Sequence, residues 1–195
     1  MCPGKDIVTG GGGAVLGTRG RGQEEYNLNQ AQARLQVLIF YPSDWEDDSL
    51  SLLSAFSSLH NKFLATQCCL YGCSTDSVQN HLSWIKAEFG CDLAFPLLSD
   101  MTGQLGDRYS LFDKEEGINM RAVVITDSKL KKLEVINSSL ESGELAQYVL
   151  NIVKQACEAP VEAGRTGRVG GEEGKVVGSK VSGILHYFGM ACLSI

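Results

Sequence analysis

Apolar residues in the middle of the chain follow two patterns of spacing. Short β-branched and aromatic runs, such as those at 35–41 and 66–74, predict buried strands. Apolar residues at spacings of three, such as Leu50, Leu53 and Phe56, predict a helix with one buried face. The predicted order is strand, helix, strand, helix, strand, strand and helix, which is typical of an α/β sandwich. In chain order, these elements lie at 35–41, 50–64, 66–74, 76–89, 122–125, 131–137 and 145–157, with a further helix at 102–109 and a polar loop at 111–117.

The segment from Val37 to Phe56 contains the junction that matters most for function. An apolar strand ends near Pro42, four acidic residues follow within 44–48, and helical spacing resumes at Leu50. Ser49 stands where the N-cap of that helix is expected. Because a helix N-terminus carries exposed N–H groups and partial positive charge, this junction suits an anion or a thiolate.

Glycine divides the chain into three parts. Sixteen of the 22 glycines lie in residues 1–22 and 158–195, and only six lie in residues 23–157. This contrast predicts a disordered glycine-rich tail at 1–22, one folded domain at 23–157 and a loose C-terminal tail at 158–195. The glycines of the first tail lack the spacing of a phosphate-binding loop.

Charge and hydropathy exclude two classes of partner. The segment 23–157 carries ten Lys and Arg against 18 Asp and Glu, a net charge of −8, which argues against nucleic acid. No apolar run approaches the roughly 20 residues of a membrane-spanning helix, so no membrane association is expected.

Seven cysteines occur, at positions 2, 68, 69, 73, 91, 157 and 192. Residues 1–22 have no apolar central region, so no signal peptide is expected. An odd cysteine count without secretion predicts reduced, mostly buried thiols and a cytoplasmic location. A zinc site at Cys68, Cys69 and Cys73 is disfavoured because adjacent strand residues point to opposite faces. We therefore expect neither a metal ion nor a cofactor.

Three stretches match one protein family in register. Tyr41, Pro42, Asp44 and Trp45 are followed by an apolar helix with Ala55 and Phe56. Further matches are Asp76, Ser77, His81 and Trp84, then the segment FPLLSD at 95–100, and Gly117 with Arg121 before an apolar strand. In this pattern the chain resembles the peroxiredoxins, the alkyl hydroperoxide reductase and thiol-specific antioxidant group, over about residues 26–157. The resemblance implies a thioredoxin-like sandwich with a central mixed sheet, and thiol-dependent reduction of hydroperoxides.

The departures from the family pattern fall on its chemistry. Ser49 occupies the position of the family's peroxide-attacking cysteine, and Glu46 occupies that of its active-site Thr. The second, resolving cysteine of the family is not recognisable, because Cys157 comes too early and lacks the family's Val-Cys-Pro context. A substitute role for Cys157, which precedes Glu158, Ala159 and Pro160, stays open as a disfavoured alternative. A serine hydroxyl cannot become anionic as a thiol does, and oxygen has no sulfenic acid chemistry.

The resemblance assigns the site to Pro42, position 49 and Arg121. Arg121 takes the place of the arginine that holds peroxide and stabilises the thiolate. An equally weighted alternative is a strand-end arginine paired with the acids at 44–48. The resemblance implies that His81 and Trp84 are packing residues.

Two main functional hypotheses follow. In the first, peroxidase activity is lost or strongly impaired, and the protein acts by self-association or by association with active peroxiredoxins. In the second, the chain is an active thiol peroxidase, reduced by thioredoxin, that uses another cysteine such as Cys91. A serine hydrolase built on Ser49 is disfavoured, since the Gly-x-Ser-x-Gly turn is absent.

Overall fold

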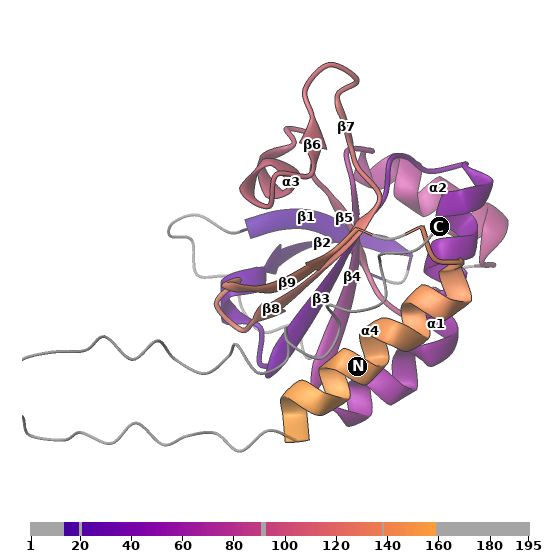
Figure 1. Ribbon diagram of the computed structural model, residues 1–195. Helices are drawn as coiled ribbons and strands as arrows, with labels where there is room; N and C mark the ends of the chain where they lie inside the picture. Colours follow the sequence, from indigo (N-terminus) through magenta and orange to yellow (C-terminus); the bar gives the residue numbers. More distant parts are fainter. Residues whose placement is uncertain (1–13, 20, 91–92, 138, 159–195) are drawn as a thin grey trace, which may run out of the picture. The chain divides into compact units, whose positions relative to one another are not determined.

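A seven-stranded mixed sheet forms the centre of the computed structural model, which describes residues 14–19, 21–90, 93–137 and 139–158. The strand order is β2-β1-β5-β4-β3-β8-β9 (Figure 1). Strands β3, β4 and β5 pair in parallel, and the other pairings in this sheet are antiparallel. The strands are β1 (Ala14–Arg19), β2 (Gly22–Asn27), β3 (Leu35–Phe40), β4 (Cys68–Ser74), β5 (Leu97–Ser99), β8 (Ala122–Asp127) and β9 (Lys132–Ile136).

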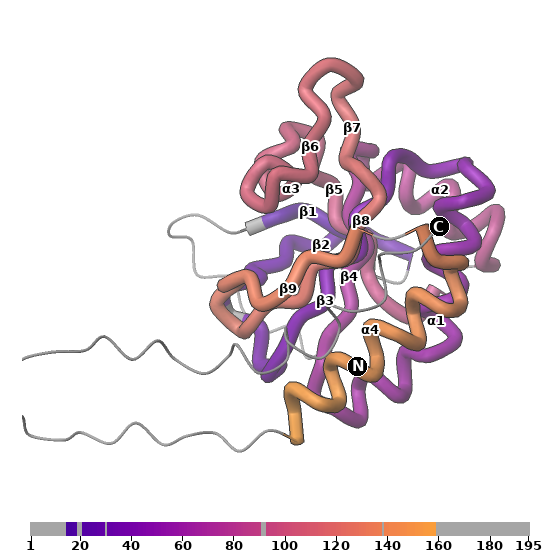
Figure 2. Tube along the Cα trace, viewed as in Figure 1, coloured from indigo at the N-terminus to yellow at the C-terminus, as the bar shows by residue number. Residues whose placement is uncertain are grey.

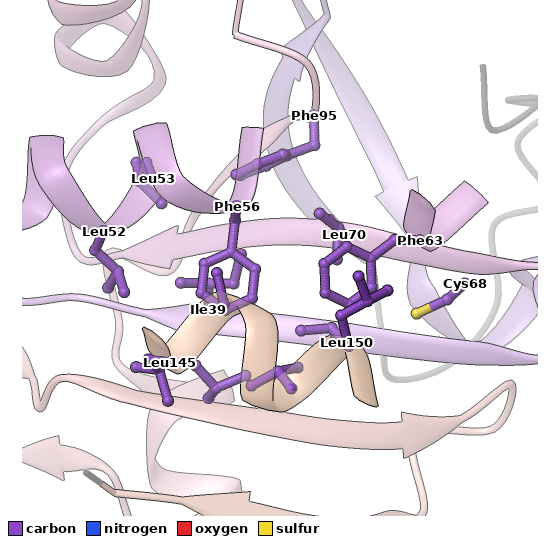
Figure 3. Close-up of a cluster of buried hydrophobic side chains, with 14 of the residues drawn as sticks. Ile39, Leu52, Leu53, Phe56, Phe63, Cys68, Leu70, Phe95, Leu145 and Leu150 are labelled. Atoms are coloured by element: carbon purple, nitrogen blue, oxygen red, sulfur yellow. The ribbon is translucent and has the colours of Figure 1, made fainter. Parts of the chain in front are cut away.

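Helices cover both faces of this sheet. On one face, α1 and α4 pack against each other and against β3 (Figures 1 and 3). Helix α2 adds Trp84 and Ile85 to the same apolar cluster. On the other face, a second apolar cluster contains Leu105 of α3 and Leu28 of η1. They pack with the residues of β3, β4 and β8 that point to this face. The helices are η1 (Leu28–Gln30), α1 (Asp47–Ala65), α2 (Val78–Glu88), α3 (Gln104–Arg108) and α4 (Ser142–Glu158). The predicted sandwich of a central mixed sheet flanked by helices is confirmed.

The central strand β3 is buried along its whole length, because it is covered on both faces. Alternate residues feed opposite clusters: Val37 and Ile39 face α1 and α4, whereas Leu38 and Phe40 face the second cluster. This is the reason that the sequence shows a continuous apolar run here rather than a polar and apolar alternation.

The N-terminal boundary predicted between residues 22 and 23 is wrong. Strand β1 pairs with β2 along its length and meets β5 at Gly17 and Leu98. The hairpin is also hydrogen-bonded to β5, because the Leu97 N–H donates to Thr18 Oγ1 at 3.0 Å. Strand β2 is mostly exposed, so its sequence lacks an apolar alternation. The expected tails at 1–13 and 159–195 lie outside the described residues.

Two other boundaries differ from the sequence prediction. The segment 111–117, expected to be a polar loop, includes strand β6 (Phe112–Asp113), which pairs with β7 (Ile118–Asn119) in a small hairpin that projects from the sheet (Figure 2). Helix α1 begins at Asp47 with Glu46 as its N-cap, not after Ser49. Two acids in the first turn favour this earlier start, because they face the positive end of the helix dipole.

Candidate functional site

Ser49 lies inside the first turn of α1, and its side chain is buried. The residue is 2% exposed, and its Oγ has no hydrogen-bond partner among the described residues. An unpaired buried hydroxyl is costly, on the order of 1–3 kcal/mol. The predicted site residue is therefore held by the fold at a helix N-terminus, and its polar atom has no structural bond to explain it.

The topology brings Pro42 and Arg121 to the end of the sheet where α1 begins. Phe40, the last residue of β3, pairs with Ala122, the first residue of β8. Pro42 follows Phe40 by two residues, and Arg121 immediately precedes Ala122, so both lie at this end. The half-buried Arg121 donates from Nη2 to the carbonyl oxygen of Leu140 at 3.3 Å. This contact orients the guanidinium but assigns it neither of the two roles predicted from the sequence.

The three acids before Ser49 remain in solvent. Glu46, Asp47 and Asp48 are all exposed, and Glu46 accepts from the Ser43 hydroxyl at 2.7 Å. Like charges near an ionising group oppose a second negative charge, although water and salt weaken the effect for exposed side chains. The first turn of α1 thus combines a dipole that favours an anion with carboxylates that oppose one.

A buried carboxylate and imidazole hold the loop between β3 and α1. His81 of α2 is 0% exposed, and its Nδ1 lies 2.8 Å from Asp44 Oδ2. The Tyr41 hydroxyl donates to Asp44 Oδ1 at 3.1 Å, and His81 Nε2 lies 3.3 Å from the Leu98 carbonyl oxygen. Burial raises the pKa of the Asp44 carboxyl, and the bond to His81 opposes that shift. His81 is thus a polar anchor for the loop as well as a packing residue.

Asp76 completes this anchor from the end of β4. Its carboxylate accepts from the Asp44 backbone N–H at 2.8 Å and from Asn80 Nδ2 at 2.7 Å. Trp45, which has a positive φ of 68° and is 53% exposed, donates its indole N–H to Asn80 Oδ1 at 3.0 Å. The sequence analysis named Asp44, Asp76 and His81 as family matches but did not predict that they contact each other. The loop at 41–45 and the residues at 76–81 are more than 30 residues apart in the chain, so no local pattern joins them.

The cysteines divide by burial. Cys68 and Cys73 are free and 0% exposed, and burial raises the pKa of both thiols. Cys157 is free and half-buried. Cys69 is disulfide-bonded, so the prediction of reduced thiols is wrong for this residue. Cys91, the alternative nucleophile predicted from the sequence, lies outside the described residues.

The described part of the chain contains neither a metal-binding cluster nor a membrane-spanning helix. Residues 14–19, 21–90, 93–137 and 139–158 contain no group of three or more His, Cys, Asp or Glu side chains arranged to hold a metal ion. Within the same ranges, no helix is both long and apolar enough to cross a membrane.

Comparison with known proteins identifies the family. The fold and the helix-terminal site define a thioredoxin-like α/β protein, and residues 16–134 match the AhpC/TSA family. The chain is 30% identical to peroxiredoxin 2 of Drosophila melanogaster over 135 residues, which are 67% of this chain and 70% of that protein. It therefore belongs to the peroxiredoxin family. The match covers only 58% of the length of a putative peroxiredoxin of Entamoeba histolytica, at 30% identity and 67% of this chain.

Solved structures show the same fold. Thioredoxin peroxidase I of Plasmodium yoelii matches with a TM-score of 0.67 and 22% identity, over 73% of this chain and 85% of that chain. Prx1a of the same organism, modified at the N-terminus, forms an artifactual octamer, and it matches with a TM-score of 0.66 and 22% identity over 73% of this chain and 86% of that chain.

Proposed function

We propose that this chain is a peroxiredoxin-fold protein in which thiol-dependent reduction of hydroperoxides is lost or strongly impaired. The observation that carries the proposal is Ser49, a buried hydroxyl in the first turn of α1. The site consists of position 49 with Pro42 and Arg121 around it. A hydroxyl in this place is neither ionised near neutral pH nor oxidised to a sulfenic acid, so the first step of peroxide reduction has no nucleophile.

The two fully buried thiols support this proposal. The thiols of Cys68 and Cys73 are wholly buried and have raised pKa values, because burial disfavours the thiolate. A buried thiol with a raised pKa is a poor nucleophile toward peroxide. Neither residue is therefore a substitute for the missing cysteine.

We propose that the protein acts by association, with itself or with active peroxiredoxins, in the cytoplasm. Among the similar solved structures, Prx1a of Plasmodium yoelii modified at the N-terminus forms an octamer that is artifactual but shows that this fold can associate. Exposed apolar side chains are available for contact, and they include Trp45, Met101 and Met120 at 53%, 68% and 41% exposure. Thioredoxin is a partner only in the alternative in which Cys91 or another cysteine carries peroxidase activity.

The rate of hydrogen peroxide consumption with a thioredoxin reducing system tests the site. We expect no turnover by the natural protein and slow turnover by Ser49→Cys, because a thiol at the helix N-terminus can ionise. Ser51→Cys is the matched control, since Ser51 lies on the same helix but is exposed. Turnover by the natural protein contradicts the proposal and directs attention to Cys91. Equal rates for the two variants would mean that position 49 has no special environment.

Sedimentation velocity at micromolar concentration tests the association. We expect a species larger than the 21.1 kDa chain, alone or after mixing with an active peroxiredoxin. A strict monomer in both experiments argues against the association role without affecting the assignment of the site.

A further inference from the structure

Two free thiols lie together at the end of the sheet from which β3 and β4 start. Cys68 is the first residue of β4, and Cys157 is in the last turn of α4. The Cys157 Sγ donates to the carbonyl oxygen of Thr66 at 3.3 Å, two residues before Cys68. Cys157 also packs against the apolar cluster of α1, β4 and α4. Figure 3 shows three members of this cluster, Cys68, Phe63 and Leu150.

Arg34 fixes the same arrangement independently. Its backbone N–H donates to the carbonyl oxygen of Gln67 at 3.0 Å, next to Cys68. Its guanidinium donates from Nη1 to the carbonyl oxygen of Cys157 at 2.7 Å and from Nη2 to that of Ala156 at 3.2 Å. One residue therefore joins the end of α4 to the turn before β4, so the two cysteines are held near each other by two separate sets of contacts.

The two thiols differ in accessibility. Cys68 is 0% exposed, and burial, with the nearby Cys157 as a smaller cause, raises its pKa. Cys157 is half-buried, so it is the more accessible of the two residues. Cys73, the other free cysteine on β4, lies in the cluster on the opposite face of the sheet. We therefore assign the first reaction with an oxidant to Cys157 and the second step to Cys68.

We propose that Cys157 and Cys68 form a redox-active pair that a hydroperoxide converts to an intramolecular disulfide. In the first step the Cys157 thiolate attacks one peroxide oxygen, an S–O bond forms, the O–O bond breaks, and the leaving oxygen takes a proton to give water or an alcohol. In the second step Cys68 attacks the Cys157 sulfur, an S–S bond forms, and hydroxide leaves with the Cys68 proton as water. Two thiols are oxidised by two electrons and one hydroperoxide is reduced.

This disulfide would tie α4 to the sheet. It would close a loop of about 90 residues, for which constraint of the unfolded chain predicts substantial stabilisation. We expect the thermal midpoint of the oxidised protein to rise by about 10 °C, reversibly with dithiothreitol. The pair lies at the opposite end of β3 and β4 from Ser49, so it is separate from the proposed function and independent of turnover at that site.

Peptide mapping of the full chain after one equivalent of hydrogen peroxide tests the proposal. We expect a disulfide-linked peptide pair that contains Cys68 and Cys157, with the loss of two free thiols per chain. Cys157→Ser should abolish both the linked peptide and the rise in the thermal midpoint. The matched control is Cys73→Ala, which removes a buried free thiol from the same strand and should leave the linked peptide unchanged.

If a variant fails to fold, the peptide map of the oxidised natural protein still tests the proposal. Oxidation of Cys157 to sulfinic acid without a link to Cys68, or a link from Cys157 to a different cysteine, would overturn the proposal. The linked peptide is measured after a single equivalent of peroxide and without a reducing system, so its absence overturns the pair and leaves the proposed function intact. Turnover with a reducing system contradicts the proposed function, whichever cysteine carries it.

Discussion

At the scale of single residues, the first turn of α1 sets the chemistry of the site. The helix dipole favours a negative charge at position 49, whereas the carboxylates of Glu46, Asp47 and Asp48 oppose it. The three acids are exposed, so solvent weakens their effect but does not remove it. In the proposed function, serine at position 49 and a carboxylate at position 46 therefore act in the same direction.

The double variant Glu46→Thr with Ser49→Cys should react faster with hydrogen peroxide than Ser49→Cys alone. Removal of a negative charge near the new thiol lowers its pKa and increases the thiolate fraction at neutral pH. The pH dependence of the reaction rate measures this shift, and the gap should shrink at high salt. Equal pH profiles for both variants would show that Glu46 does not act on position 49.

His81→Leu should destabilise the protein by about 3 kcal/mol or more, because Asp44 would be left buried without its partner. Urea unfolding measures the loss. Gln79→Ala on the exposed side of the same helix is the control and should change stability little. A loss below about 1 kcal/mol for His81→Leu would mean that the buried pair does not hold the loop.

Asp44 also gives a pH dependence with a definite sign. Its pKa is raised in the folded state by burial, so the folded protein binds the proton more tightly than the unfolded chain does. The contribution of this group to stability is therefore greatest at acid pH and is lost as pH rises through the folded-state pKa. Asp44→Asn should remove this component from unfolding curves measured upward from the ordinary carboxyl pKa of about 4. An unchanged pH profile in the variant would contradict the assignment.

At the scale of elements, strand β1 was the largest omission of the sequence analysis. Residues 14–19 stand in a glycine-rich segment, and glycine there suggested a tail. The structure gives Gly17 a steric reason instead, since a Cβ at this position would lie 2.8 Å from the carbonyl oxygen of Leu97. Absence of a side chain allows β1 to approach β5.

Gly17→Ala should therefore destabilise the protein by about 1–3 kcal/mol, because a backbone atom cannot move aside as a side chain can. Chemical unfolding measures the change. Gly143→Ala near the start of α4 is the matched control, since a Cβ there meets nothing within 4 Å. If the two substitutions had the same effect, β1 would not pack on β5 in solution.

At the scale of the whole molecule, the described elements include β1, which begins at residue 14, before the predicted domain start at residue 23. We expect a fragment of residues 14–158 to fold alone and to unfold within a few degrees of the full chain. A fragment of residues 23–158 lacks β1 and leaves the edges of β2 and β5 unpaired. It should unfold at least about 5 °C lower, as circular dichroism would show. Equal midpoints for the two fragments would mean that β1 adds nothing.

The sequence by itself determined the central layer of the fold and supplied the candidate site residues. Strands β3, β4 and β8 and helices α1, α2 and α4 carry strong apolar patterns, because each buries one face or both. Ser49, Pro42 and Arg121 were found from local motifs, which are contiguous in the chain. These features are encoded by residues close together in the chain, so the sequence shows them directly.

Tertiary structure decided the rest, because it depends on residues far apart in the chain. The edge hairpin of β1 and β2 is mostly polar and gains its place from β5, about 80 residues away. The buried pair of Asp44 and His81 joins a loop to a helix 37 residues later. Cys68 and Cys157 meet only because α4 returns across the sheet and Arg34 fixes its end. No local sequence pattern encodes such contacts, because they form, and stabilise the protein, only when distant segments come together in the folded chain.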